Sequence, residues 1–403
     1  MKAVVWHGPG DIGLDTVADP VIEQPTDAIV RITRSAICGT DLHLVRGTMP
    51  GMRDGTILGH EAVGLVEEVG SAVRGFSPGD RVVVTSTIGC GNCSYCRAGY
   101  YAQCDKANPN GPAAGTSFFG GPESTGPVHG LQAEYARIPY AATTLVRVPP
   151  NVTDDQAILV SDIFPTGWFG ARLAEVSDGD TVLVLGAGVV GQFAVASAKR
   201  QGASRVLVVD GLETRLVKAL EQNAEVIDFN RDDPVGTVRE LTDGIGVDRV
   251  IDAVGVDATR PRQGPAAARA EELDETFERE RAAVAPDAAP DEDTWVPGDA
   301  PSLALRWAVS AVAKAGTLGV IGVYPPTFDT LPFGAAMNKN LTVNAGNCNH
   351  RKYVPGLLDL VATGVVDPTT FITKQEEPVS AIEAYQRFDR REDGWLKTVL
   401  TVN

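Results

Sequence analysis

The sequence predicts an α/β protein with a β-rich N-terminal part and a doubly wound parallel sheet in its second half. Up to about residue 150, short apolar stretches at 2–6, 28–32, 61–69 and 81–84 alternate with Gly- and Pro-containing turns, which is typical of a compact barrel or sandwich. From residue 181 onward, apolar runs of strand length alternate with helical segments. That alternation favours parallel strands covered by helices on both faces.

We expect the second part to start with a buried strand at 181–185 and a helix to about residue 201, after a domain boundary between about 160 and 180. The later elements are expected, in chain order, as strand 205–210, helix 213–222, strand 225–229, helix 235–241, strand 247–254, helix 302–314, strand 317–323 and strand 341–345. Residues 257–301, rich in Ala, Glu, Asp and Pro, interrupt this order. Two interpretations stay open for them: a poorly packed inserted loop with a surface helix at 266–284, or a lid over a cofactor or a subunit contact.

The charge and the apolar pattern exclude several classes of function. The chain has 35 Lys and Arg against 52 Asp and Glu, a formal net charge of −17, which disfavours nucleic acid or anionic lipid as a partner. No apolar run approaches the roughly 20 residues that cross a bilayer. The N-terminus reaches Gly8 too early to hold the apolar core of a signal peptide. We therefore expect a cytoplasmic protein with no nucleic-acid and no membrane partner.

Four of the six cysteines form one compact motif. Cys90, Cys93, Cys96 and Cys104 have the spacing C-x2-C-x2-C-x7-C, with glycines beside them. Thiolates bind zinc tetrahedrally, and short glycine-containing spacers let one loop surround the ion. A four-cysteine site has no open position, so it would be structural. An iron–sulfur cluster also takes four cysteines, but nothing else in the sequence indicates electron transfer.

Cys38 and the segment Gly59-His60-Glu61 are candidates for a second, catalytic metal site. A thiolate and an imidazole are good zinc ligands, and a catalytic site needs a third protein ligand and an open position. Taken alone, the two residues are weak indications, because a buried cysteine and a hydrogen-bonded histidine give the same pattern.

Residues 186–191, GAGVVG, fit the G-x-G-x-x-G fingerprint between a strand and a helix, which is the context that a dinucleotide-binding (Rossmann) site requires. Gly186, Gly188, Val190 and Gly191 are assigned to the cofactor, because this turn and the helix N-terminus present N–H groups to a pyrophosphate. Asp210 ends the next strand, where its carboxylate can bind the ribose hydroxyls of NAD and repel the 2′-phosphate of NADP.

Together and in this order, the motifs resemble the zinc-containing alcohol dehydrogenases of the medium-chain dehydrogenase/reductase superfamily, over nearly the whole chain. The resemblance implies a GroES-like catalytic domain formed by residues 1–163 and 347–403, with a structural zinc lobe at about 89–105. It also implies a Rossmann NAD-binding domain at 164–346, with the insertion at about 257–301.

The same resemblance implies the ligands of the catalytic zinc. Cys38 and His60 match the first two ligands. The third is a cysteine in many members, but the matching tract here is SDIFPTG at 161–167. This tract is similar to the glutathione-independent formaldehyde dehydrogenase branch, in which an aspartate takes this place, so we expect Asp162 as the third ligand. The long segment before Trp307 points to the same branch.

Roles for four neighbouring residues also follow from the resemblance. Thr40 is expected to hold the substrate oxygen, and His43 to pass the proton outward. Asp41 is expected to orient the ring of the second ligand. Glu61 lies at the position behind the zinc.

Three further residues are implied in cofactor binding. Thr166 is expected near the nicotinamide and Arg215 near the adenosine ribose. Lys397 stands where the family usually has a phosphate-binding arginine, and a lysine offers only a point charge there. His350 has no assigned role.

The resemblance thus implies a zinc-dependent oxidoreductase that transfers hydride between a small alcohol or aldehyde (hydrate) and NAD, with two zinc ions per chain. The 257–301 insertion motivates one alternative, a formaldehyde dismutase-like enzyme that retains its NAD. A non-catalytic NAD-binding scaffold protein is another, because a fold alone does not establish an activity. A homodimer or homotetramer is expected from the resemblance.

Overall fold

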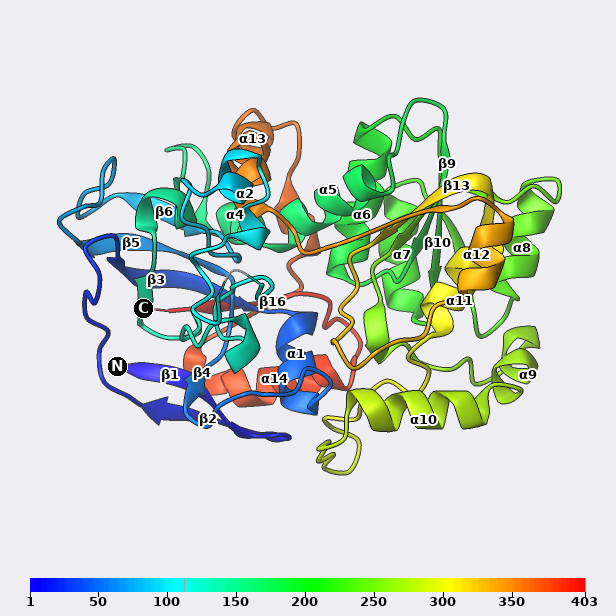
Figure 1. Ribbon diagram of the computed structural model, residues 1–403, viewed down its shortest axis with the longest axis horizontal. Coiled ribbons are helices and arrows are strands. Elements are labelled where there is room, and N and C mark those ends of the chain that lie inside the picture. Colours follow the sequence, from blue (N-terminus) through cyan, green and yellow to red (C-terminus); the bar gives the residue numbers. More distant parts are fainter. Residues whose placement is uncertain (112, 403) are drawn as a thin grey trace. The chain divides into compact units, whose positions relative to one another are not determined.

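The computed structural model describes residues 1–111 and 113–402, and the chain divides into two compact units (Figure 1). The first unit comprises Met1–Pro165, Asp287–Val296 and Asn347–Asn403. The second comprises Thr166–Pro286 and Pro297–Gly346. The first unit therefore includes ten residues from within the insertion, all of which we had expected in the second.

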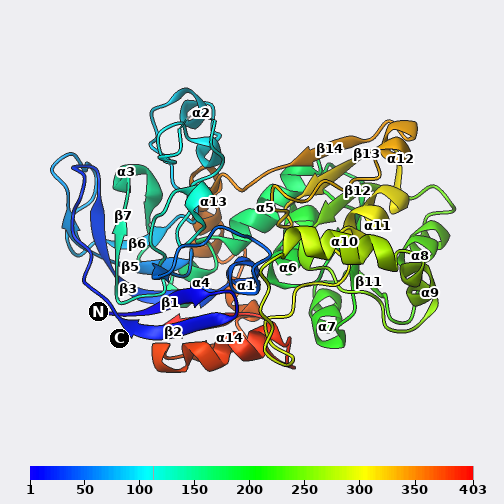
Figure 2. The same cartoon turned by 60° about the horizontal axis from the view of Figure 1, so that its bottom comes forward.

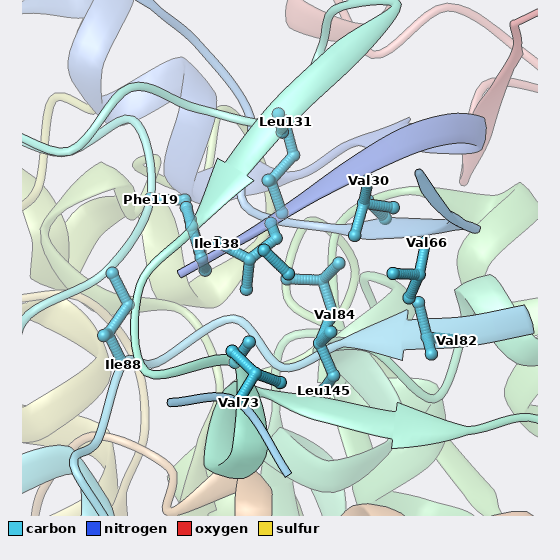
Figure 3. Packing of buried hydrophobic residues seen from close by; sticks show 14 of the residues in the cluster. Val30, Val66, Val73, Val82, Val84, Ile88, Phe119, Leu131, Ile138 and Leu145 are labelled. Carbon is cyan, nitrogen blue, oxygen red and sulfur yellow. The ribbon is translucent and has the colours of Figure 1, made fainter. Parts of the chain in front are cut away.

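The first unit is built on two sheets. One has the strand order β15-β16-β3-β5-β6-β8, with β7 also paired to β3, and the other has the order β2-β1-β4. The strands are β1 (Lys2–Gly8), β2 (Asp11–Thr16), β3 (Ala28–Ile37), β4 (Thr56–Ile57), β5 (Ala62–Val69), β6 (Arg81–Val84), β7 (Tyr135–Ile138), β8 (Leu145–Arg147), β15 (Lys374–Glu376) and β16 (Thr398–Thr401). Valines from β3, β5 and β6 pack with Leu131 and Ile138 in the core of the larger sheet (Figure 3). This explains the apolar stretches of the N-terminal sequence.

The first unit also contains helices, which lie between its strands in the chain. They are α1 (Gly39–Arg46), α2 (Ser94–Arg97), α3 (Ala141–Thr144), α4 (Asp154–Ile158), α13 (His350–Ala362) and α14 (Ala381–Asp389), with 3-10 turns at Tyr101–Gln103, Glu123–Thr125, Pro368–Phe371 and Pro378–Ser380. Helix α5 (Ile163–Leu173) begins in this unit and ends in the second. Helix α1 follows Cys38, which is its N-cap, and helix α13 starts at His350.

The second unit contains a six-stranded parallel sheet in the order β11-β10-β9-β12-β13-β14. Its strands are β9 (Thr181–Leu185), β10 (Arg205–Asp210), β11 (Glu225–Asp228), β12 (Val247–Asp252), β13 (Val312–Val320) and β14 (Thr342–Ala345). Its helices are α6 (Val189–Arg200), α7 (Glu213–Glu221), α8 (Pro234–Leu241), α9 (Pro265–Glu271), α10 (Asp274–Val284), α11 (Leu303–Ala311) and α12 (Phe333–Asn338), with a 3-10 turn at Gly255–Asp257. The strand order reverses direction beside β9, which is where open α/β sheets bind their ligands.

Both faces of this parallel sheet are buried. In β9, Val182 and Val184 pack against α6 and α7, whereas Leu183 and Leu185 face the cluster that contains α8 and α11. Successive side chains of a strand point to opposite faces, so a strand covered on both sides is apolar throughout. This confirms the prediction of a doubly wound sheet. Strand β13 begins earlier than expected, because Val312 already pairs with β12.

The insertion is folded, which contradicts its interpretation as a poorly packed loop. The expected helix at 266–284 is two helices, α9 and α10 (Figure 2). Phe277 of α10 is fully buried against Leu303 and Trp307 of α11. Further on, Trp295 is 3% exposed in the core of the first unit, and its backbone N–H donates to Asp389 Oδ2 at 2.6 Å.

No helix within the described ranges is both long enough and apolar enough to cross a membrane.

Candidate active site

Three residues that lie far apart in the chain converge in the first unit. The ligand atoms of Cys38, His60 and Asp162 lie within 4.8 Å of one another, and so does a carboxylate oxygen of Glu61; all four residues are buried. Asp162 Oδ2 is 3.3 Å from His60 Nε2 and 3.8 Å from Cys38 Sγ. Sulfur, nitrogen and oxygen donors at such distances fit a divalent zinc ion. The structure thus brings together the three expected ligands.

Local structure places the first two of these residues. Strand β3 ends at Ile37, and Cys38 caps α1, where its backbone N–H donates to Asp41 Oδ2 at 2.9 Å. Gly59 has a φ of +91°, and a Cβ there would lie 2.4 Å from the side chain of Gln132. Only glycine fits both conditions, so the chain can turn sharply before His60.

Asp41 lies against the far side of the His60 ring. Its Oδ1 is 3.1 Å from His60 Nδ1, and its Oδ2 also accepts from Gln132 Nε2 at 3.3 Å. Burial alone would lower the pKa of His60, but the carboxylate of Asp41 and the neighbouring Cys38 raise it well above its ordinary range. A carboxylate behind a metal-binding imidazole leaves the other ring nitrogen for the metal, which is the arrangement expected for Asp41.

Thr40 and His43 lie on α1 beside these ligands. Thr40 Oγ1 is 3.9 Å from Cys38 Sγ. His43 is buried, with its Nδ1 2.8 Å from Thr48 Oγ1. Because residues three apart share one face of a helix, the two residues project to the same side of α1.

Lys397 lies in a place that differs from the expected one. Its side chain and that of Glu61 are fully buried, and its ammonium donates to Glu61 Oε1 at 2.5 Å and to the carbonyl of Ile37 at 3.1 Å. Burial alone would lower the pKa of Lys397, but the carboxylate of Glu61 raises it. In the first unit, Lys397 therefore neutralises a buried carboxylate, and it has no exposed surface that it could offer to a phosphate.

His350, which the sequence left without a role, contacts the third expected ligand. His350 Nε2 lies 2.6 Å from Asp162 Oδ1, and His350 Nδ1 lies 3.0 Å from Thr87 Oγ1. Burial would raise the pKa of Asp162, but the hydrogen bonds from His350 and His60 hold it well below its ordinary value. The sequence did offer one indication that Asp162 needs such a partner: a carboxylate ligand has a second oxygen, and a buried oxygen needs a hydrogen-bond donor.

The four cysteines of the compact motif also come together. Their sulfur atoms lie within 4.8 Å of one another, and all four are free thiols in the structure. Backbone N–H groups of Cys90 and Lys106 donate to Cys104 Sγ, and that of Cys96 donates to Cys93 Sγ. Burial opposes ionisation of Cys93, but such N–H groups lower its pKa to about 7. The site fits a metal that binds thiolates.

The glycine-rich turn of the second unit has the form that a pyrophosphate needs. It joins β9 to α6, with Gly186 at a φ of +85° and Gly188 as the N-cap. A Cβ on Gly191 would lie 1.9 Å from the carbonyl oxygen of Gly186, so only glycine fits there. Val190 lies in the first turn of α6, where backbone N–H groups point toward the helix N-terminus.

Asp210 lies beside this turn. It accepts hydrogen bonds from the backbone N–H groups of Ala187, Gly211 and Leu212 at 2.7–2.9 Å. Arg215 is 4.0 Å away from its Oδ2. Thr166 is half-buried in α5, in the same unit. The carboxylate of Asp210 thus lies at the end of β10, next to the glycine turn.

Comparisons with known proteins identify the family of the chain. Residues 24–150 match the alcohol dehydrogenase GroES-like domain, and residues 189–263 match the zinc-binding dehydrogenase family. A zinc-type alcohol dehydrogenase-like protein of Bacillus subtilis is 35% identical over 404 residues, covering 99% of this chain and 100% of that protein. The chain belongs to the zinc-type alcohol dehydrogenases.

A solved structure supports the same family for the present chain. The alcohol dehydrogenase of Thermus sp. ATN1 is 31% identical, with a TM-score of 0.79 and 100% of both chains covered. The glutathione-independent formaldehyde dehydrogenase of Pseudomonas aeruginosa is 37% identical over 64% of this chain and 66% of that protein. The family is thus established over the whole chain, whereas the likeness to the formaldehyde dehydrogenase covers about two thirds of it.

Membership confirms several sequence predictions. The chain is a zinc-dependent oxidoreductase with a GroES-like domain and a Rossmann-like parallel sheet, from a family that acts on small alcohols or aldehydes with a nicotinamide cofactor. The chain is thus an enzyme of the zinc-dependent dehydrogenase type, and the alternative of a non-catalytic scaffold protein is wrong.

Proposed function

We propose that this dehydrogenase transfers hydride between a small alcohol or aldehyde (hydrate) and NAD, at a zinc ion held by Cys38, His60 and Asp162. The observation that carries the proposal is the meeting of one sulfur, one nitrogen and one carboxylate oxygen within 4.8 Å in a buried site. A zinc ion held by these three residues would keep a position open for the substrate. It would act as a Lewis acid and lower the pKa of a substrate oxygen.

The residues on α1 supply the proton path. Thr40, 3.9 Å from Cys38 Sγ, would orient the substrate hydroxyl and take up its proton while passing its own proton to the ribose of the bound nicotinamide, from which it reaches His43. His43, one turn further along the same face, receives a proton and is held through Nδ1 by Thr48. Loss of the proton raises the electron density on the substrate carbon and favours hydride departure, so these two residues set the protonation state of the substrate.

We assign the cofactor as NAD from the second unit. The turn formed by Gly186, Gly188, Val190 and Gly191 offers backbone N–H groups to the pyrophosphate. Asp210, at the end of β10, places a carboxylate where the ribose hydroxyls of NAD would bind, and its charge repels a 2′-phosphate. Arg215 and Thr166 complete the assignment, at the adenosine ribose and near the nicotinamide.

We propose two zinc ions per chain. Cys38, His60 and Asp162 hold the catalytic ion, and the four clustered cysteines hold the structural one. The test compares Cys38→Ser with Cys90→Ser by metal analysis, circular dichroism and turnover. We expect Cys38→Ser to stay folded, keep one zinc and lose activity, and Cys90→Ser to lose stability. An unchanged turnover rate of Cys38→Ser would reject the site.

A dismutase-like reaction with retained NAD is a second candidate. The observation that favours it is the packed state of the insertion, in which Phe277 is fully buried against α11. An ordered segment of this kind can slow the exchange of a cofactor. The test is the nucleotide content of the native protein after extensive desalting. Protein that carries NAD and disproportionates an aldehyde without added cofactor supports this candidate, and protein free of NAD argues against it.

We further propose that the enzyme works in the cytoplasm as a homodimer or homotetramer, without nucleic acid or membrane as partner. The net charge of −17 supports the last part of this proposal, because it repels polyphosphate and anionic lipid. Light scattering of the purified protein tests the oligomeric state.

A further inference from the structure

The two oxygens of Asp162 face different partners. Oδ2 lies toward the other two expected ligands, 3.3 Å from His60 Nε2 and 3.8 Å from Cys38 Sγ. Oδ1 lies 2.6 Å from His350 Nε2, on the other side of the carboxylate. Oδ2 is therefore the oxygen that lies beside the other two expected ligands.

The ring of His350 is held firmly in this position. It is 2% exposed, and its Nδ1 lies 3.0 Å from Thr87 Oγ1, which also lies 3.2 Å from the carbonyl oxygen of Cys348. The start of α13 is anchored as well, because Asn349 Oδ1 accepts from the backbone N–H of Ala102 at 2.9 Å. A nitrogen lone pair facing a carboxylate at 2.6 Å would be repelled. Nε2 therefore carries the hydrogen and donates it to Asp162 Oδ1.

The need for such a donor follows from the type of the third ligand. A thiolate has one donor atom, whereas a carboxylate has two and can bind a metal through one oxygen or both. Binding through both oxygens would fill the position that a catalytic zinc keeps open for water or substrate. A hydrogen bond to one oxygen withholds it from the metal.

We propose that His350 is a positioning residue that holds Asp162 Oδ1 and so keeps Asp162 a ligand through Oδ2 alone. Thr87 sets the orientation of the His350 ring. This inference rests on the proposed zinc site. It also implies a coupling, because His350 has this task only while residue 162 is a carboxylate.

The experiment replaces the catalytic zinc by Co²⁺, whose visible absorption is several times stronger in four-coordinate than in five-coordinate sites. We expect His350→Ala to lower this absorption toward five-coordinate values and to reduce kcat/KM by about 10–100-fold, the usual effect of losing a hydrogen-bond partner behind a metal ligand. His350→Gln, whose side-chain amide can place an N–H near Nε2, should restore both. His7→Ala, at a half-exposed histidine of the same unit, is the matched control.

The coupling supplies the decisive comparison. In an Asp162→Cys background, adding His350→Ala should change the cobalt spectrum and kcat/KM less than threefold, because no second oxygen remains to be held. Equal effects of His350→Ala in both backgrounds, or a His350→Ala spectrum like that of the parent, would overturn the proposal. A parent protein whose cobalt spectrum is insensitive to Cys38→Ser would instead reject the zinc site itself, so the two failures are distinguishable.

Discussion

The buried pair of Lys397 and Glu61 allows a sharp test of what this lysine does in the first unit. Both side chains are fully buried and their charged atoms are 2.5 Å apart. Replacing Lys397 by Met keeps most of the volume but leaves the carboxylate of Glu61 without its counter-charge. Removing one partner of a buried ion pair costs about 3–5 kcal/mol. For a unit of this size, that loss corresponds to a fall in Tm of roughly 6–20 °C.

The assay is thermal unfolding followed by calorimetry or circular dichroism, together with the KM for NAD. The double variant Lys397→Met/Glu61→Gln should recover most of the loss, since it removes both charges. Lys218→Met is the control, because its ion pair with Glu221 at 2.8 Å is partly exposed and such pairs contribute about 0–1 kcal/mol. If Lys397→Met left Tm unchanged and raised the KM for NAD, Lys397 would be a phosphate contact, and our assignment of it would be wrong.

Three further perturbations test other parts of the structure. Trp295→Ala should lower the unfolding free energy of the first unit by about 3–5 kcal/mol in denaturant titrations. Val296→Ala, at an exposed side chain, should change it by less than about 0.5 kcal/mol. Equal effects of the two substitutions would show that residues 287–296 are not anchored in the first unit. Asp210→Asn should raise the ratio of kcat/KM for NADP over NAD by about 10–100-fold, since one unit charge beside a phosphate is worth roughly 1.4–2.8 kcal/mol, and a constant ratio would reject the role of Asp210. Removal of metal by a chelator should abolish turnover, and Zn²⁺ but not Mg²⁺ should restore it, because thiolate and imidazole donors select zinc.

Local sequence patterns predicted most of the secondary structure, because the positions that a strand or helix buries are apolar in the sequence. Strand β9 is apolar at every position since both of its faces are covered, and the GAGVVG turn that follows is glycine-rich because Gly191 has no room for a Cβ. The insertion was harder to predict. Its Ala- and Glu-rich composition indicates a surface helix, yet a few apolar side chains such as Phe277 and Trp295 decide where it packs.

The candidate sites divide in the same way. The four clustered cysteines and the glycine turn are short-range motifs, so their spacing already implies that one loop can surround a ligand. Cys38 and His60 were only weak candidates by themselves, and Asp162 came only from the resemblance to a family, because no spacing rule joins the three residues. The contact of His350 with Asp162 spans 188 positions, and that of Lys397 with Glu61 spans 336, and neither pairing was predicted.

By itself, the amino-acid order determined the type of each half, the thiolate cluster and the nucleotide turn, since these depend on residues only a few positions apart. Tertiary structure alone decided the partners of the buried carboxylates at the proposed metal site: the ammonium of Lys397 beside Glu61 and the imidazole of His350 beside Asp162. The physical reason is that charged and polar groups removed from water must find partners among whatever side chains the packing of strands and helices brings near. Such partners are set by the folded geometry and leave no periodic signal in the chain.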